Sequence, residues 1–358
     1  MTIDEMDLIR ELKEVEPLRA EVYEAARAAL RSAIADEQQT PLVAARSDRQ
    51  RRRTLVTRGM VGAGIAAVAA AVALFAVLGS NPALTSHAPV GSNAAVGKVN
   101  GKLMHLAADI TAEPTPPGNA TLVQRTQSYP DSPTITGADL YTDSGEYFYA
   151  ATESGLPSAI QSNADVGGGI GAREVAAALY AVNGNLDTAR EMMANAPFPG
   201  GVHPSLQEEL AQAQAAVPVL KAKGVNLPAP TAASVAAHEK SSTDNSIWMD
   251  SIDAFAAGAG NPQVRAGILR ILSTLPEVTV TNTTTNGLPT LTVTATAPAL
   301  PANYQEALTI DAATGVPVSF AGGTPGQVPS VTIAYQISRV TMSDMAAGNF
   351  SEGSTPLS

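Results

Sequence analysis

The side chains best suited to chemistry are few and stand far apart along this chain. The four histidines are His87, His105, His203 and His238, and none has a histidine or acid at the spacing of a known metal motif. The chain has no cysteine, which excludes a thiol nucleophile, a disulfide and a thiolate-held metal. We therefore expect surface or capping roles for the histidines, and we assign no metal ligand and no catalytic residue.

A glycine-rich run at residues 167–171 (GGGIG) has the composition of a phosphate-cradling loop. A dinucleotide-binding loop follows a strand and a P-loop ends in Gly-Lys-Ser/Thr, and neither feature is present here. The run is therefore expected to be a loop that leads into a helix. The acid pairs Glu208-Glu209 and Asp250/Asp253 fall on predicted amphipathic helices, where solvated faces explain them. The sequence predicts no enzyme and no bound cofactor.

Trp248 is the only tryptophan, and it shares a predicted helical face with Ile247, Ile252 and Phe255. Such a face packs between helices and a sheet, or it lines a ligand site. Trp248 is the one candidate for a ligand-lining residue.

The elements that must position these residues lie beyond an apolar segment at residues 59–79, which contains no charge and no proline. As a helix it would span about 30 Å, the thickness of the hydrocarbon core of a bilayer. Six arginines (46, 49, 51, 52, 53 and 58) precede it, and no Lys or Arg occurs in the next 15 residues. The positive-inside rule then predicts a cytoplasmic N-terminus and an exported C-terminal part.

A cleaved signal is the alternative to a retained anchor. Arg52-Arg53 before an apolar run is similar to a twin-arginine export signal, and cleavage would release the exported part. The region before the apolar core would then exceed 50 residues, and the core itself is longer than usual for a signal. Retention is favoured, but cleavage stays open.

Charge is distributed unevenly along the chain. Residues 80–358 hold 22 acids and 11 bases, a net charge of −11, while the charges of residues 1–40 and 41–58 cancel. Nucleic-acid binding needs a basic face, so the exported part is not expected to bind nucleic acid. The basic run is expected to lie against anionic lipid headgroups of the bilayer.

The sequence divides into five parts. They are a cytoplasmic helical arm (1–45), a basic juxtamembrane linker (46–58), a transmembrane helix (59–79), a stalk (80–92) and an extracytoplasmic domain (93–358).

The arm carries an apolar helical stripe, and we take Leu18, Val22, Leu30 and Ile34 as its partner-binding candidates. A lone amphipathic helix has no core of its own to cover, so it is expected to contact itself, the membrane surface or another protein. A partly ordered stub is the alternative. Within the span, small residues four apart, such as Gly59 and Ala63, permit a homodimer.

The exported part shows strands, then helices, then strands. Strands are predicted at 121–129, 137–142, 147–151, 277–283, 290–297, 305–311, 317–321 and 330–342, and helices at 93–109, 172–183, 186–196, 205–223, 244–257 and 262–275. This order predicts an α+β fold with one antiparallel sheet and helices packed on one face.

Three pieces together resemble an actinobacterial family of single-span membrane proteins, largely uncharacterised and often encoded beside extracytoplasmic-function sigma factors. The pieces are the arm sequence MDLIRELKEVEPLRAEVYEAARAALRSAI, the arginine-flanked span, and Trp248 with NPQVRA (261–266), Leu275-Pro276 and LTIDAATG (308–315). The strand–turn–strand LTIDAATGVPVSF also resembles the terminal hairpin of lipoprotein-carrier-like half-barrels. That second resemblance implies a half-barrel-like sheet.

Two functions follow as expectations. The first is a membrane-anchored, anti-sigma-factor-like sensor in signal transduction, with a sigma factor or similar protein on the arm and a ligand or partner on the exported domain. Many anti-sigma factors carry a zinc site with cysteines, which this chain lacks. The second is a cell-envelope protein that binds a lipid or lipoprotein in a half-barrel and has a passive anchor.

Overall fold

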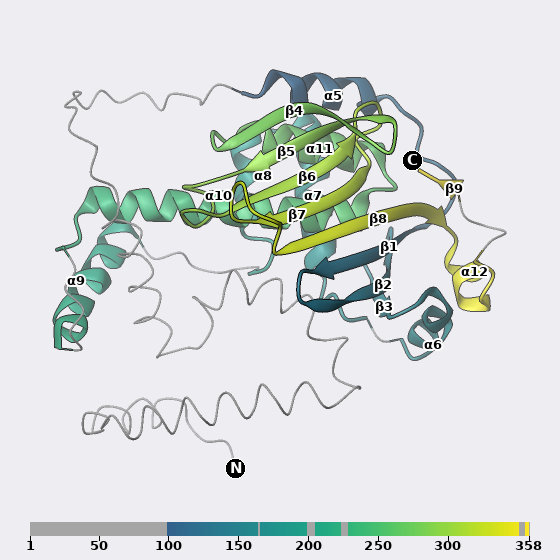
Figure 1. Ribbon diagram of the computed structural model, residues 1–358, viewed down its shortest axis with the longest axis horizontal. Coiled ribbons are helices and arrows are strands. Elements are labelled where there is room, and N and C mark those ends of the chain that lie inside the picture. The colour runs from purple at the N-terminus through teal and green to yellow at the C-terminus, as the bar shows by residue number, and fades with distance from the viewer. Residues whose placement is uncertain (1–98, 164, 199–204, 223–227, 351–354, 358) are drawn as a thin grey trace, which may run out of the picture. The chain divides into compact units, whose positions relative to one another are not determined.

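The computed structural model describes residues 99–163, 165–198, 205–222, 228–350 and 355–357 (Figure 1). The predicted arm, basic linker, transmembrane helix and stalk lie outside these residues, as do the candidates Leu18, Val22, Leu30 and Ile34. Within the described ranges, no helix combines the length and the apolar character needed to cross a bilayer.

One antiparallel sheet organises the domain. Its strands follow the order β3-β2-β1-β8-β7-β6-β5-β4, and the short β9 pairs with β8. The strands are β1 (Ala120–Tyr129), β2 (Ser132–Thr142), β3 (Tyr147–Ala150), β4 (Val278–Thr285), β5 (Leu288–Ala295), β6 (Gln305–Asp311), β7 (Pro317–Gly323), β8 (Val331–Val340) and β9 (Thr355–Pro356). The predicted α+β class with one antiparallel sheet is confirmed, and the sheet is open.

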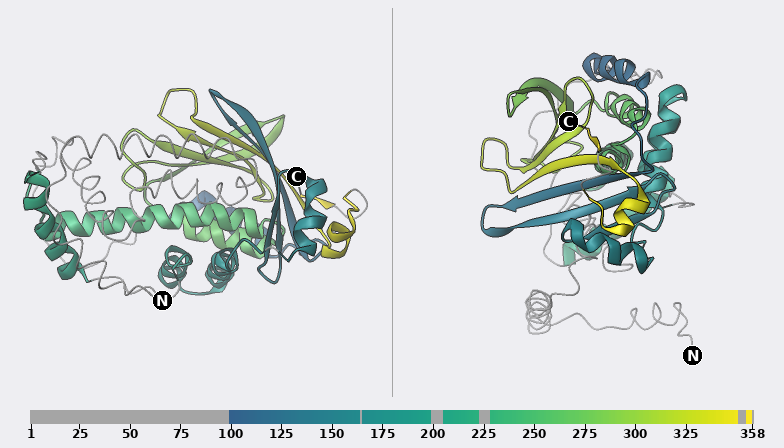
Figure 2. Two further views of the ribbon diagram at one scale, coloured as in Figure 1. Left: turned by 90° about the horizontal axis from the view of Figure 1, so that it is seen from below. Right: turned by 90° about the vertical axis from the view of Figure 1, so that its right-hand side faces the viewer.

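Eight helices accompany the sheet in the described ranges. They are α5 (Gly101–Thr111), α6 (Leu156–Gln161), α7 (Ile170–Asn183), α8 (Leu186–Ala194), α9 (Leu206–Ala222), α10 (Ala232–Gly258), α11 (Pro262–Leu272) and α12 (Met342–Ala347). α10 and α11 run under the sheet, and α7 and α8 form a further layer beyond α10 (Figure 2).

The main core lies between the sheet and α5, α7, α10 and α11. Alternation along β5 shows how the sequence builds it, because Leu291 and Val293 are buried against the helices while Thr292 and Thr294, on the other face, are partly exposed. α11 begins at Asn261, whose side chain accepts the amide hydrogen of Gln263 at 2.9 Å, with Pro262 in the first turn.

The expectation that helices pack on one face holds for this larger set but not for α6 and α12. The neighbours Leu122 and Val123 point to opposite faces of β1. Leu122 packs in a cluster with Leu156 of α6 and Met345 of α12, whereas Val123 packs with Ala259 at the end of α10. Strands β1–β3 therefore separate α6 and α12 from α10 (Figure 2).

α10 differs most from its predicted extent. The helix was predicted over 244–257, but it begins at Ala232 and runs for 27 residues. Thr231 and Ser234 form a reciprocal capping box, with the Thr231 hydroxyl accepting the Ser234 amide at 3.1 Å. This capping box marks a helix start that the prediction missed.

Candidate functional site

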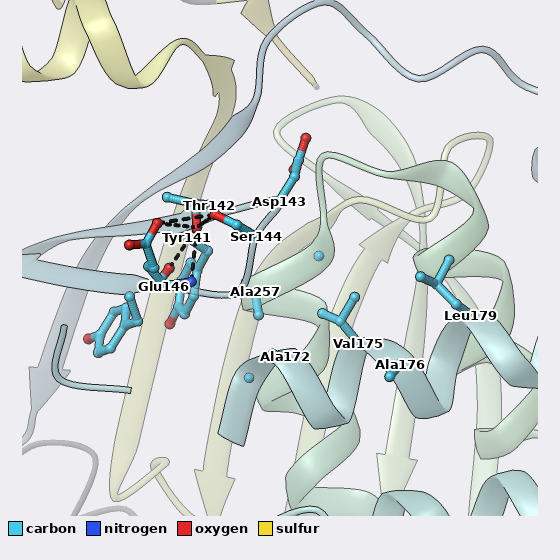
Figure 3. A pocket seen from close by; sticks show the side chains of 14 residues that line it. Tyr141, Thr142, Asp143, Ser144, Glu146, Ala172, Val175, Ala176, Leu179 and Ala257 are labelled. Carbon is cyan, nitrogen blue, oxygen red and sulfur yellow. Dashed lines mark hydrogen bonds between the residues drawn. The ribbon is translucent and has the colours of Figure 1, made fainter. Parts of the chain in front are cut away.

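A groove of about 220 Å³ opens between the β2–β3 turn, the start of α7 and the end of α10. Figure 3 shows the turn with Thr142, Ser144 and Glu146 on one side and α7 with Ala172, Val175 and Leu179 on the other. Tyr141 and Tyr147 flank the turn and also line the groove. The groove therefore combines two phenols, a polar turn and a helix face of small apolar side chains.

The polar turn is held in one conformation by short hydrogen bonds. The Ser144 hydroxyl donates to the Glu146 carboxylate at 3.1 Å, and the Glu146 amide donates to the Thr142 hydroxyl at 2.9 Å. Gly145 has a φ of 96°, and a side chain there would meet the Ala172 Cβ at 2.5 Å. Glycine thus allows the turn to approach α7 and close one end of the groove.

The position of Asp143 is fixed by a buried arginine, Arg339. Both guanidinium nitrogens of Arg339 contact the Asp143 carboxylate, at 2.9 and 2.8 Å, and Arg339 also donates to the Gly118 carbonyl at 2.7 Å. Arg339 is only 1% exposed. This bidentate pair sets the position of the turn, because it joins the turn to β8.

The tyrosines form a neutral aromatic surface. The Tyr141 and Tyr147 rings stack with centroids 4.7 Å apart. The Tyr147 hydroxyl donates to Asp139 at 2.5 Å, and the Arg125 Nε donates to the same carboxylate at 2.6 Å. Burial, followed by nearby Tyr141 and Asp139, raises the pKa of Tyr147 well above its usual value of 10.0. The phenol is therefore a hydrogen-bond donor at neutral pH.

The glycine-rich run leads into a helix, as predicted. Gly168 and Gly169 both have positive φ, and Gly169 precedes the first residue of α7. The Asp165 carboxylate accepts the amide hydrogens of Gly167 at 2.8 Å and of Tyr147 at 3.1 Å. Arg173 lies over the loop and donates to the Ala196 carbonyl at 2.6 Å. The run thus connects α6 to α7, and Asp165, just before it, bonds the first residue of β3.

Three carboxylates converge between α7 and α10. Oxygens of Glu174, Asp250 and Asp253 lie within 4.8 Å of one another. Glu174 is fully buried and Asp250 is 5% exposed, which corrects the expectation that Asp250 lies on a solvated face. Carboxylate oxygens so close together are the ligands that suit a hard cation such as Ca²⁺ or Mg²⁺.

Trp248 lies in the helix–sheet core and outside the groove. It is fully buried, and its indole N–H donates to the buried Glu306 carboxylate at 2.6 Å. The Trp248 side chain thus has the packing role that the sequence offered as one alternative. Trp248 is not among the residues that line the groove, and its proposed role in lining a ligand site stays a prediction.

The two described histidines stand apart from the groove. His105 is on the exposed face of α5, with its Nδ1 2.7 Å from an Asp109 oxygen, and His238 lies on α10. His87 and His203 are outside the described residues. The structure therefore brings none of the described histidines to this site.

Comparison with protein-family models, curated proteins and solved structures finds no match to this chain. The family resemblance of the sequence therefore stays a prediction.

Proposed function

We propose that this protein is a membrane-anchored regulatory sensor whose exported domain binds a ligand or partner in the groove beside the β2–β3 turn. The carrying observation is the apolar segment 59–79 with arginines on one side only, because it assigns the arm and the domain to opposite sides of a membrane. The arm would hold a cytoplasmic protein such as a sigma factor.

The groove supports binding of a small group. Its volume of about 220 Å³ is below the roughly 300–1,000 Å³ of typical ligand pockets. It therefore suits a small amphipathic group or one side chain of a partner. Val175 and Leu179 would contact the apolar part, while the polar turn would hydrogen-bond the polar end.

The lipid-carrier alternative draws less support. In a half-barrel carrier, the open sheet curves around an apolar chamber. Here Trp248, Phe255 and Leu308 are buried in the layer between the sheet and α10. A whole lipid chain would need space that these described side chains fill. We therefore place the ligand in the groove at the edge of that layer.

The arm is the part that tests the regulatory role. Val22→Asp and Leu30→Asp place charges in the apolar stripe and are expected to reduce co-purification of the sigma factor with the full-length chain at least about tenfold, a loss of about 1.4 kcal/mol. Sigma-dependent transcription would rise in the same cells. Glu24→Lys, on the opposite face, is the control and should leave both readouts unchanged.

Retention of the same sigma factor by Val22→Asp, with unchanged transcription, would refute the regulatory role. The regulatory role would also be refuted if no sigma factor co-purified with the wild-type chain or with any variant.

A further inference from the structure

The two edges of the sheet differ sharply in how they are protected. At one edge, β3 has four residues and is followed by a segment that bonds to it, since the Val166 amide donates to the Tyr147 carbonyl at 3.0 Å. At the other edge, β4 has eight residues and pairs only with β5 among the described strands (Figure 1). Residues 281–284 of β4 are exposed in succession.

The β4 strand itself carries none of the charges that usually protect an edge strand. No Asp, Glu, Lys or Arg occurs from residue 278 to residue 305, although the whole chain carries a net charge of −11. Natural proteins discourage pairing between edges with charges, prolines, bulges or very short strands. β4 has none of these, and its ladder with β5 is regular over all eight positions.

The turn identifies which backbone groups face outward. Asn286 and Gly287 both have positive φ, 52° and 82°, as in a type I′ turn of two residues. In such a hairpin the flanking residues, Thr285 and Leu288, form a hydrogen-bonded pair, and hydrogen bonding then alternates along the ladder. The N–H and C=O groups of Val280, Asn282 and Thr284 therefore point away from β5.

We propose that β4 pairs antiparallel with β4 of a second copy of this chain, with the two-fold axis at Asn282. Val280, Asn282 and Thr284 then face Thr284, Asn282 and Val280 of the other copy, which gives six main-chain hydrogen bonds. On the outer face, Thr279, Thr281, Thr283 and Thr285 meet Thr285, Thr283, Thr281 and Thr279.

Self-pairing fits because the edge is self-complementary. The Thr283 hydroxyl is hydrogen-bonded to the hydroxyls of Thr290, at 2.8 Å, and Thr292, at 2.9 Å, on the outer face of β4 and β5. The symmetric register continues these threonine rows into the second copy, and cross-strand threonine pairs stabilise a sheet. Lys102 of α5 donates to the Asn282 side chain at 3.1 Å. In the symmetric pair the Lys102 side chains of the two copies would face each other across the axis, so salt that screens their repulsion should favour dimer formation. The pairing geometry is independent of the proposed membrane topology.

Single cysteines test this register directly, because the chain contains no cysteine. In full-length protein purified in detergent, Asn282→Cys lies opposite its own copy, with Cα atoms about 5.5 Å apart, within the disulfide range of about 4.4–6.8 Å. Thr284→Cys is equally exposed and faces the same side, but its copies are offset by about 13 Å. Mild oxidation should yield at least roughly fivefold more dimer for Asn282→Cys than for Thr284→Cys.

Charge exchange provides the second test. In the Asn282→Cys background, Thr281→Lys with Thr283→Lys places four lysines at the two-fold axis and should abolish the disulfide dimer. Mixing this chain with one carrying Thr281→Glu and Thr283→Glu should restore it, because each lysine then faces a glutamate. The proposal would be overturned by equal cross-linking of Asn282→Cys and Thr284→Cys, by no cross-linking of Asn282→Cys, or by no restoration of the dimer on mixing. Each of these results would mean that the β4 edge is free or pairs with a different protein.

Discussion

At the scale of single residues, the contact between α7 and α11 depends on Gly267. A Cβ at this position would lie 1.8 Å from the Ala178 carbonyl oxygen of α7, so the two helices could not keep their distance. Gly267→Ala is therefore expected to lower the free energy of unfolding by roughly 1–3 kcal/mol or more, as overpacking does. Thermal unfolding followed by circular dichroism measures the loss.

Gly101, in the first turn of α5, is the matched control. A Cβ there meets no atom within 4 Å, and alanine favours helix. Gly101→Ala should leave the melting temperature unchanged or raise it. A Gly267→Ala melting temperature as high as that of Gly101→Ala would contradict the close helix contact.

The pKa values of the two described histidines are shifted in opposite directions. Hydrogen bonding and charge from Asp109 raise the pKa of His105 above its usual 6.5, while burial lowers that of His238. The His105–Asp109 pair therefore stabilises α5 fully below pH 6.5, and the stabilisation is lost as pH rises through the raised pKa. NMR titration of labelled histidines measures both values. Asp109→Asn should lower the pKa of His105 toward its usual value of 6.5. A His105 pKa that is unaffected by this change would exclude the pair.

The residues of the groove show what a sequence reveals about a site. Tyr141 and Tyr147 lie in the consecutive predicted strands 137–142 and 147–151, so their pairing followed from local pattern. Arg339, the partner of Asp143, is 196 positions away, and nothing local links them. Burial of Asp250 likewise depends on α7 packing against α10, which residue spacing within α10 does not encode.

At the scale of elements, β8 joins the two halves of the sheet. It pairs with β1 on one side and β7 on the other, with Ala120 opposite Val340 and Phe320 opposite Ile333. A chain that ends at residue 330 is expected to lose the cooperative unfolding transition, because β1–β3 would be cut off from β4–β7. A chain that ends at Phe350 loses only β9 and should keep it. A cooperative transition in the shorter chain would refute the joining role of β8.

Most elements of the domain were predictable because their patterns are local. Alternation located the strands, and helical spacing predicted α7, α8 and α11 at 172–183, 186–196 and 262–275. The order strands, helices, strands also predicted one antiparallel sheet. The helices α6 and α12 were missed, since six residues are too few to show a helical period.

At the scale of the whole molecule, we propose that an acidic folded domain is joined through a membrane segment to a cytoplasmic arm. All of the formal net charge of −11 belongs to residues 80–358. Such a domain is unsuited to phosphate-rich partners, and its groove offers phenols, hydroxyls and apolar side chains instead. Regulation would then require that the domain and the arm lie on opposite sides of the bilayer.

Labelling of single cysteines with a membrane-impermeant maleimide tests this arrangement most directly. Val328, which is 78% exposed, reports on the domain, and Ser47, in the basic linker between the arm and the apolar segment, reports on the N-terminal side. In intact spheroplasts, Val328→Cys should be labelled and Ser47→Cys should be protected, and both should react after lysis. Protection of Val328→Cys with labelling of Ser47→Cys, or equal labelling of both before lysis, would contradict the proposed topology.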